Sequence, residues 1–172
     1  MDALVFDTSA ILNFGQRGKL QPLLISLAPT HRLFTTPDVV AELTDPAHKE
    51  FNSTLLSDHF TVQQTATVPF DLPTISRLTL ALDPGEISVM MLAKEIKATA
   101  VLDERAARRE AGSLGLKITG TLGLLHEAAQ HRWMTDDQCL AAVGRLCLAG
   151  FRIRPPGANE TFAEYVRSFP HP

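Results

Sequence analysis

The chain has 172 residues, 45% of them hydrophobic, with a mean hydropathy of +0.04 and a formal net charge of −3. This length suits one domain with a sizeable core, and the apolar fraction excludes an intrinsically disordered chain. The two cysteines, Cys139 and Cys147, form no CxxC pair, which speaks against a disulfide framework or a cysteine zinc site and favours reduced thiols.

The N-terminal half opens on a short apolar run. Residues 4–6 end at Asp7, which predicts a buried strand that turns into a helix capped by a carboxylate or a hydroxyl. Leucines then recur with the spacing of an amphipathic helix, and Pro37 suits a first helical turn. The pattern predicts a strand at 4–6, a helix at 20–27, a strand at 31–36, a helix from 37, a helix at 46–57, a strand at 60–64 and a loop at 65–73.

The C-terminal half continues the alternation more clearly. It predicts a helix at 83–97, a strand at 99–102, a helix at 104–114, a strand at 116–119, and helices at 122–131 and 135–149. The Pro-Pro-Gly segment at 155–157 indicates a linker. Phe162, Tyr165, Val166 and Phe169 follow at helical spacing. This stripe must pack on the body of the protein, on a second subunit or on a partner.

Strands that alternate with helices imply parallel strands joined by helical crossovers. We therefore expect an α/β fold, with a central parallel sheet between layers of helices. The predicted organisation is one domain over residues 1–150 and a C-terminal extension over 151–172 that contains a short amphipathic helix. No stretch approaches the roughly 20 apolar residues of a membrane span, and residues 1–12 lack the features of a signal peptide. We expect a cytoplasmic protein with no membrane partner.

Acidic residues recur where predicted strands end and predicted helices begin. Asp7 and Asp103 directly follow apolar strands, whereas Glu42 and Glu86 lie early in helices. Ligands of open parallel sheets bind beyond the carboxyl ends of the strands, so these side chains should converge there, with Glu104 as a candidate fifth acid. Clustered carboxylates favour hard cations such as Mg²⁺ or Mn²⁺. Two such ions can activate water and stabilise the leaving oxygen of a phosphodiester.

Each acid also has a purely structural interpretation, and the sequence leaves both open. Asp7 and Asp103 fit helix N-caps, and Glu42 fits a solvated helix face. Asp83 and Glu86 fit a capping box, in which Glu86 reaches back to the Asp83 backbone. The ordered recurrence of the acids, rather than any one of them, favours a shared site.

Other chemistries fit the sequence poorly. A phosphatase of the haloacid dehalogenase type needs an Asp at position 9, where this chain has Ser9. His126, Glu127 and His131 miss the spacing of the zinc-binding HExxH motif by one residue. Basic residues cluster between 105 and 117 and fit either a nucleic-acid contact or a solvated helix face. The negative net charge mildly disfavours nucleic-acid binding.

Four segments resemble the PIN-domain family, the fold of the VapC-type toxins of bacterial and archaeal toxin–antitoxin pairs. They are residues 5–9, 37–43, 85–87 and 101–104. Residues 102–125 are the most specific part and resemble a PIN-like branch of predicted nucleic-acid-binding proteins. The resemblance covers roughly residues 1–150.

The resemblance implies an endoribonuclease that depends on Mg²⁺ or Mn²⁺. Asp7, Glu42, Glu86 and Asp103 would form its catalytic and metal-binding quartet. Many of the toxins carry Asp where this chain has Glu86, which changes the reach of that carboxylate by one methylene.

The resemblance also implies roles for other residues and for partners. Ser9 would support the site through its hydroxyl, and Arg105 and Arg108 would contact the RNA backbone or else have a structural role. A homodimer and inhibition by a small antitoxin are further implications. The alternative function is a non-catalytic PIN scaffold that binds RNA or protein.

Overall fold

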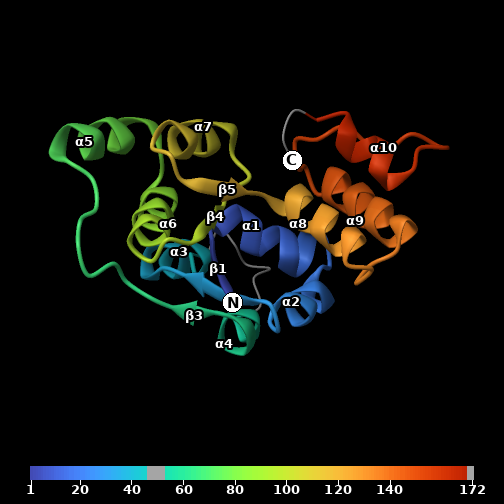
Figure 1. The fold of residues 1–172 in the computed structure, drawn as a ribbon, viewed down its shortest axis with the longest axis horizontal. Coiled ribbons are helices and arrows are strands. Elements are labelled where there is room, and N and C mark those ends of the chain that lie inside the picture. The colour runs from blue at the N-terminus through green and yellow to red at the C-terminus, as the bar shows by residue number, and fades with distance from the viewer. Residues whose placement is uncertain (46–52, 170–172) are drawn as a thin grey trace.

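The computed structural model describes residues 1–45 and 53–169 (Figure 1). Its strands form one sheet in the order β3-β2-β1-β4-β5, and every neighbouring pair is parallel. The strands are β1 (Asp2–Phe6), β2 (His31–Thr35), β3 (Thr61–Val62), β4 (Thr99–Val101) and β5 (Lys117–Thr119). The predicted α/β fold with a central parallel sheet is confirmed.

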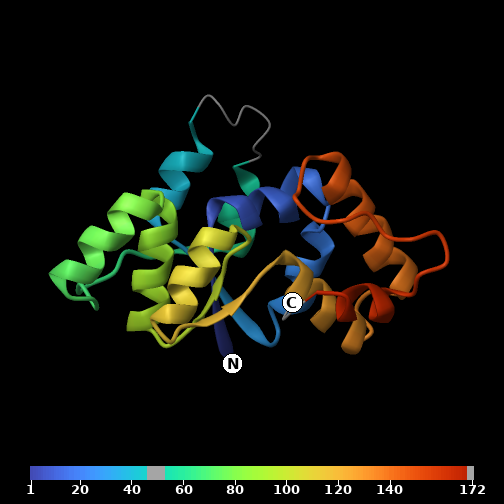
Figure 2. The ribbon, with the colours of Figure 1, turned by 90° about the horizontal axis from the view of Figure 1, so that it is seen from above.

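Helices cover both sides of this sheet. They are α1 (Thr8–Leu12), the π-helix η1 (Asn13–Arg17), α2 (Gln21–Leu27), α3 (Pro37–Leu43), α4 (Thr54–His59), α5 (Leu72–Ala81), α6 (Pro84–Glu95), α7 (Arg105–Ser113), α8 (Thr121–Gln130), α9 (Asp136–Leu148) and α10 (Phe162–Arg167). Figures 1 and 2 show α5, α6 and α7 on one side and α2, α8 and α9 on the other. None of the described helices has the length and apolar character needed to cross a membrane.

β1 lies in the middle of the sheet because its residues are apolar on both faces. Val5 is paired with Phe34 of β2 and with Ala100 of β4, and all three are buried. A strand enclosed on both faces reads as a continuous apolar run, as residues 4–6 do. The parallel arrangement brings the residues that follow β1, β2, β4 and β5 to the same edge of the sheet.

A π-turn follows α1 and was not predicted. The Gly18 amide donates to the carbonyl oxygen of Asn13 at 2.8 Å, five residues back. A Cβ at position 18 would lie 2.6 Å from that same oxygen, so the turn requires glycine. Arg145 of α9 donates through Nε to the Gly18 carbonyl at 2.8 Å and ties the turn to the outer helical layer. Single π-turns in helices are frequent at functional sites.

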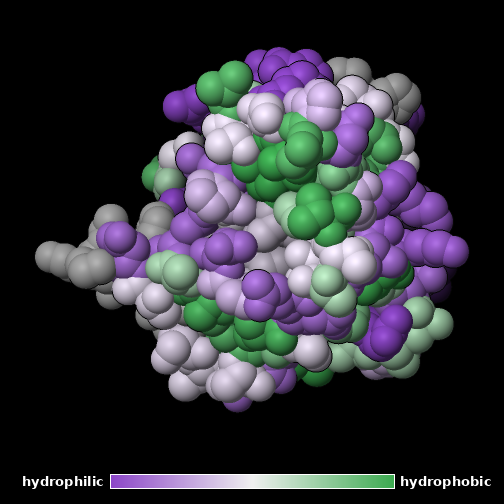
Figure 3. Space-filling view, turned by 90° about the vertical axis from the view of Figure 1, so that its left-hand side faces the viewer, coloured by the Kyte–Doolittle hydropathy of each residue, from purple (hydrophilic) through white to green (hydrophobic). Residues whose placement is uncertain are grey.

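In the described residues the predicted elements agree with the structure, apart from the π-turn and one helix. The helix α5 was not predicted, and it begins at Leu72, inside the segment expected to be a loop. Of its residues only Leu78 is buried, whereas Leu72 and Leu80 are 81% and 90% exposed. Figure 3 views the end of the molecule where α5 lies and shows apolar side chains gathered on that surface. In the predicted helix at 46–57, residues 46–52 lie outside the described residues and α4 forms the remainder.

The C-terminal stripe packs on the body of the protein. Phe162, Tyr165 and Val166 of α10 are buried in the main core, and α10 contacts α8 and α9. Tyr165 donates its hydroxyl to the carbonyl oxygen of Arg154 at 2.7 Å, and the Arg154 guanidinium lies over its ring, 4.6 Å from the centroid. The stripe therefore anchors the end of the chain within one protomer.

Candidate functional site

The carboxyl edge of the sheet opens into an acidic cavity of about 770 Å³. Residues of α1, η1, α3 and α6 line it, together with Asp7 directly after β1 and Glu104 directly before α7. Four of the five acids singled out from the sequence are among the lining residues, namely Asp7, Glu42, Glu86 and Glu104. The fifth, Asp103, does not line the cavity but interacts electrostatically with Asp7. The carboxyl edge of the sheet therefore brings four of the five acids to one cavity and leaves Asp103 outside its lining.

Asp7 both caps a helix and faces the acidic cavity. Its Oδ1 accepts from the Ala10 amide at 2.8 Å, and Ser9 donates its hydroxyl to Oδ2 at 2.9 Å. Asp7 is only 2% exposed. Burial, followed by the negative charge of Asp103 and more weakly that of Glu86, raises its pKa well above the ordinary value. The capping interpretation is confirmed and is compatible with a place in the site, where a cation beside Asp7 would stabilise its charged form.

Glu42 lies against the first turn of α6. Its Oε1 accepts from the Gly85 amide at 2.8 Å, and Thr8 donates its hydroxyl to Oε2. A Cβ at position 85 would lie 2.6 Å from both carboxylate oxygens, so glycine makes room for this contact. Glu42 is held at a helix N-terminus, where the helix dipole favours negative charge. It is not a freely solvated helix residue.

Glu86 forms the capping box that the sequence suggested, because its Oε2 accepts from the Asp83 amide at 3.1 Å. This does not remove it from the acidic cavity, which it lines beside Glu104. Burial raises the pKa of Glu86, and the charges of Asp83, Glu104 and Glu42 raise it further, against the lowering effect of the Asp83 amide. Within the described chain, Oε1 of Glu86 has no hydrogen-bond partner and is left for a ligand.

Asp103 follows β4 in the sequence, and its carboxylate lies against the start of α8. Its Oδ1 accepts from the Thr121 amide at 2.8 Å, and its Oδ2 accepts from the Thr121 hydroxyl at 2.5 Å. Asn13 of η1 donates through Nδ2 to the same Oδ2 at 2.9 Å. Asp103 thus receives three donors and is fixed in position.

Sequence reasoning missed both Asn13 and Thr121 as residues of the site. Thr121 could have been found from its place at a helix start directly after a predicted strand. Asn13 had one signal, a polar residue within an otherwise apolar run, and its contact with Asp103 spans 90 positions. Both residues are fully buried, so their role is to hold the carboxylate of Asp103.

The basic residues near the site differ in their placement. Arg105 is exposed at the first position of α7, directly after Glu104. Arg108 donates through Nη1 to the Leu102 carbonyl at 3.0 Å, which supports a structural role. Arg17, at the end of η1, lines the acidic cavity and was not predicted to do so. Within the described residues the side chain of Arg17 forms no hydrogen bond or ion pair, although the cavity around it is acidic.

The residues of this edge fit a hard divalent cation in donor chemistry and in charge. All candidate ligands are oxygen donors, which such cations prefer. The buried amide oxygen of Asn13 has no hydrogen-bond partner among the described residues. Burial raises the pKa values of Asp7 and Glu86, repulsion from the neighbouring carboxylates raises them further, and a cation would relieve this repulsion. In residues 1–45 and 53–169, no group of three or more Asp, Glu, His or Cys side chains already surrounds a common point.

The chain was compared with protein-family models and with curated proteins. A family model described as a PIN domain matches residues 3–165. This match extends past residue 150 and includes most of α10. No curated protein matches the chain.

Proposed function

Because the chain belongs to the PIN-domain family, whose members are generally nucleases, we propose that it is a metal-dependent endoribonuclease that hydrolyses RNA phosphodiesters. One observation carries this proposal. Four of the five acids singled out from the sequence line one cavity, and negative charges of this group raise the pKa values of Asp7 and Glu86 beyond the effect of burial. Such repulsion is retained in a folded protein where bound cations offset it.

The side chains that would hold a divalent cation are those of the quartet Asp7, Glu42, Glu86 and Asp103, with Glu104 as a candidate fifth acid. PIN domains typically use divalent metals, and we propose Mg²⁺ or Mn²⁺ here. Such an ion supplies an activated water and polarises the phosphodiester. The chain supplies the orientation: the hydroxyl of Ser9 fixes one oxygen of Asp7. Since this hydrogen bond is already formed in the folded protein, little reorganisation of Asp7 is needed during the reaction.

We propose that Arg105 contacts the RNA backbone on the α7 side of the acidic cavity. It is exposed and directly follows Glu104, which lines the cavity. A guanidinium binds phosphate bidentately. Arg108 has the structural contact described above, so an Arg105→Gln variant is the more direct test of RNA binding. Its affinity for RNA should fall and its dependence on salt should weaken.

We propose that the protein acts as the toxin of a toxin–antitoxin pair, inhibited by a small antitoxin. The resemblance of the four acidic segments to the fold of the VapC-type toxins supports this role. Induced expression should then arrest growth of a host cell, and Asp7→Asn should abolish the arrest. Growth arrest by both forms would contradict a toxin that acts through its nuclease site.

We propose a homodimer formed through α5. The exposed apolar side chains of Leu72 and Leu80 on this helix support it, because a monomer leaves them in water. Light scattering of the wild type should give twice the chain mass. Leu80→Glu should give the mass of one chain, with Ile25→Glu as the matched control on another exposed apolar position. A monomeric wild type would contradict the proposal.

The central experiment is RNA cleavage by the purified chain with Mn²⁺, beside EDTA and Asp7→Asn controls. We expect cleavage that requires the metal and is lost in Asp7→Asn. An RNA that binds but stays intact in every condition would favour the alternative, a non-catalytic PIN scaffold. Calorimetry with Mn²⁺ would then show whether the acidic cavity binds metal at all.

A further inference from the structure

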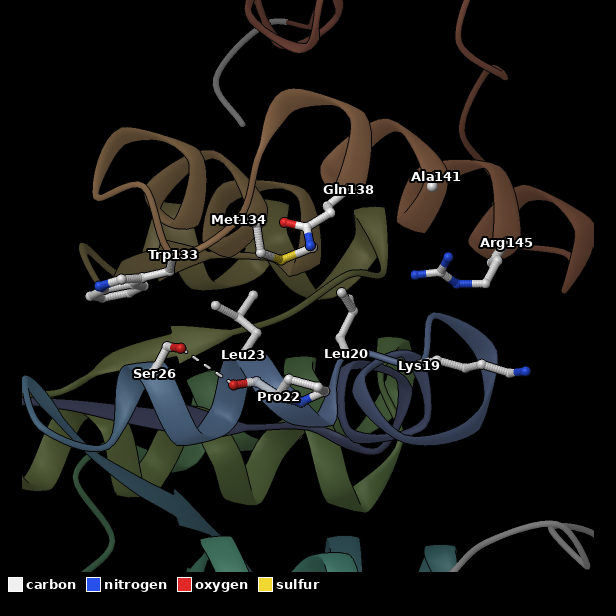
Figure 4. Close-up of a pocket in the computed structure, with 10 residues that line it drawn as sticks. All are labelled: Lys19, Leu20, Pro22, Leu23, Ser26, Trp133, Met134, Gln138, Ala141 and Arg145. Atoms are coloured by element: carbon white, nitrogen blue, oxygen red, sulfur yellow. Dashed lines mark hydrogen bonds between the residues drawn. The ribbon is translucent and has the colours of Figure 1, made fainter.

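A second cavity, of about 280 Å³, lies between α2 and α9. Its walls are mainly apolar, with Leu20, Leu23 and Met134 among the lining residues. Figure 4 shows Trp133 at one end of this cavity and the side chains of Lys19 and Arg145 at the other. We call it the α2/α9 cavity. It combines an aromatic end, an apolar middle and a cationic end.

The acidic cavity and the α2/α9 cavity have lining residues on either side of Gly18 in the π-turn. Arg17 lines the acidic cavity, and Lys19 lines the α2/α9 cavity. The two residues are separated only by Gly18, so their Cα atoms are at most about 7 Å apart. The turn between them is held by the bond from Arg145 to the Gly18 carbonyl. A ligand that extends past Arg17 from the acidic cavity needs to span only this short distance to reach Lys19.

The cations of this path are available to a ligand. Arg145 uses only Nε in its bond to Gly18, and Figure 4 shows its guanidinium pointing into the gap between α9 and the η1–α2 turn. Lys19 is exposed, and its backbone is held in the left-handed region at φ 53°. In the described chain neither side chain forms an ion pair. Two unpaired cations at one end of an apolar cavity favour a ligand with an anionic group there.

The aromatic end is equally well defined. Trp133 is half-buried and stacks on His131, with ring centroids 4.8 Å apart and planes at 19°. Met134 and Leu23 adjoin it, and the Gln138 amide points toward α2 beside them (Figure 4). A flat apolar ring with polar edges fits such walls. Nucleic-acid strands present this combination in every unit, a base for the aromatic wall and a phosphate for the cations.

We propose that the α2/α9 cavity binds one nucleotide of a single-stranded nucleic acid whose neighbouring phosphodiester lies in the acidic cavity. The base packs beside Trp133, and its phosphate lies between Lys19 and Arg145. Arg17 contacts the strand as it passes between the two cavities. This inference rests on the proposed nuclease function, because it assumes that the strand enters the acidic cavity. The small volume suits a single unit of a strand better than a helix of a partner protein.

The test uses the fluorescence of Trp133, the one tryptophan of the chain. A single-stranded RNA oligonucleotide is titrated into the full chain in EDTA, where binding is measured without cleavage. We expect quenching that saturates, and quenching by adenosine monophosphate at higher concentration. Ribose 5-phosphate, which lacks a base, should not quench. Quenching by an acidic apolar peptide, but not by the oligonucleotide, would overturn the proposal in favour of a protein partner.

A matched pair of variants tests the cationic end. Lys19→Gln should weaken oligonucleotide binding several-fold and reduce the salt slope by about 0.7, the value for one phosphate contact to a single strand. Lys97→Gln is the control, because Lys97 is also exposed and has nearly the same backbone conformation, at φ 55°. Lys97 precedes β4 and so lies at the opposite edge of the sheet. Equal affinities for the two variants would overturn the proposal.

The aromatic end is tested by Trp133→Ala, with Trp133→Phe retaining an aromatic ring. The alanine variant should bind the oligonucleotide about fivefold or more weakly, and the phenylalanine variant should recover most of the loss. If the alanine variant does not fold, the Lys19 and Lys97 pair still decides the question. Binding with quenching but without RNA cleavage in Mn²⁺ would reject the nuclease function alone. Cleavage in Mn²⁺ without quenching would reject the nucleotide subsite alone.

Discussion

The carboxylate of Glu42 occupies the space that a side chain at Gly85 would fill. Both Glu42 oxygens lie 2.6 Å from the position of a Cβ on residue 85, and one accepts the Gly85 amide at 2.8 Å. Glu42 of α3 can thus contact the first turn of α6 because residue 85 has no side chain. The segment at 85–87, which resembles the PIN family, contains the acid Glu86. Its glycine, Gly85, is needed to leave room for the carboxylate of Glu42.

Gly85→Ala should reduce RNA cleavage strongly while leaving the fold intact. The added methyl displaces the flexible end of Glu42 from the Gly85 amide, whereas alanine is otherwise favourable in a helix. Gly112→Ala in α7 is the matched control, because nothing lies within 4 Å of a Cβ there. We expect the control to keep full activity and to gain about 0.5–1 kcal/mol in unfolding free energy. Full activity in Gly85→Ala would contradict the role given to Glu42.

Asp7→Asn should abolish cleavage and stabilise the metal-free protein at neutral pH. The unfolded pKa of Asp7 is near 3.8, and the folded pKa is raised well above it. Between these values the folded state binds more protons than the unfolded state, so the free energy of unfolding falls as pH rises. Asparagine does not ionise, so the variant avoids this fall in the free energy of unfolding. Its side-chain oxygen can still cap α1.

Urea denaturation in EDTA, from pH 3.5 upward, measures this difference. The two proteins should be similar at the acid end, and Asp7→Asn should become the more stable as pH rises. Mn²⁺ should then raise the stability of the wild type and leave the variant unchanged, because a ligand stabilises only the state that binds it. A variant less stable than the wild type at every pH would contradict the burial argument.

Asn13 should tolerate alanine far better than aspartate. Asn13→Ala removes a donor to Asp103 but also an amide oxygen that lacks a partner, so we expect a net loss of about 1 kcal/mol. Asn13→Asp keeps the shape and places a carboxylate against Asp103, which should cost clearly more. Chemical denaturation compares the two, and both should lose cleavage. Equal stabilities would show that the Asn13 contact with Asp103 is unimportant.

Tyr165→Phe should cost about 1 kcal/mol of stability, because it removes the hydrogen bond to the Arg154 carbonyl and leaves the ring in the core. Burial raises the pKa of Tyr165, so its hydroxyl remains a donor throughout the working pH range. Thermal unfolding should show the loss, and RNA cleavage should be unchanged. Reduced cleavage at full stability would instead connect α10 with the site.

The sequence predicted those parts of the fold where burial is complete or periodic. Residues 4–6 formed the expected strand because both faces are covered, and α9 followed its apolar spacing. The helix α5 was not predicted because Leu78 is its one buried residue, so its sequence lacks the apolar periodicity of an amphipathic helix. The π-turn at Gly18 also escaped, since its hydrogen bond depends on a backbone shape that residue spacing does not encode.

The acidic residues were predicted from their positions at strand ends, but the groups that hold them were not. Asp103 is fixed by Asn13, 90 positions away, and Glu42 by the Gly85 amide, 43 positions away. Such contacts depend on how helices meet, which local patterns do not specify. The capping box of Glu86 was correctly foreseen, whereas its simultaneous place in the acidic cavity needed the fold.

The central position of β1 has a consequence for synthesis on the ribosome. Asp7 is among the first residues made, yet β1 must pair with β4, and Asp103 must reach Thr121. The acidic edge therefore cannot assemble until more than two thirds of the polypeptide has emerged, since domains fold as units during synthesis. Every shorter nascent chain lacks the assembled acidic edge, so premature termination yields fragments without the site to which we assign the activity.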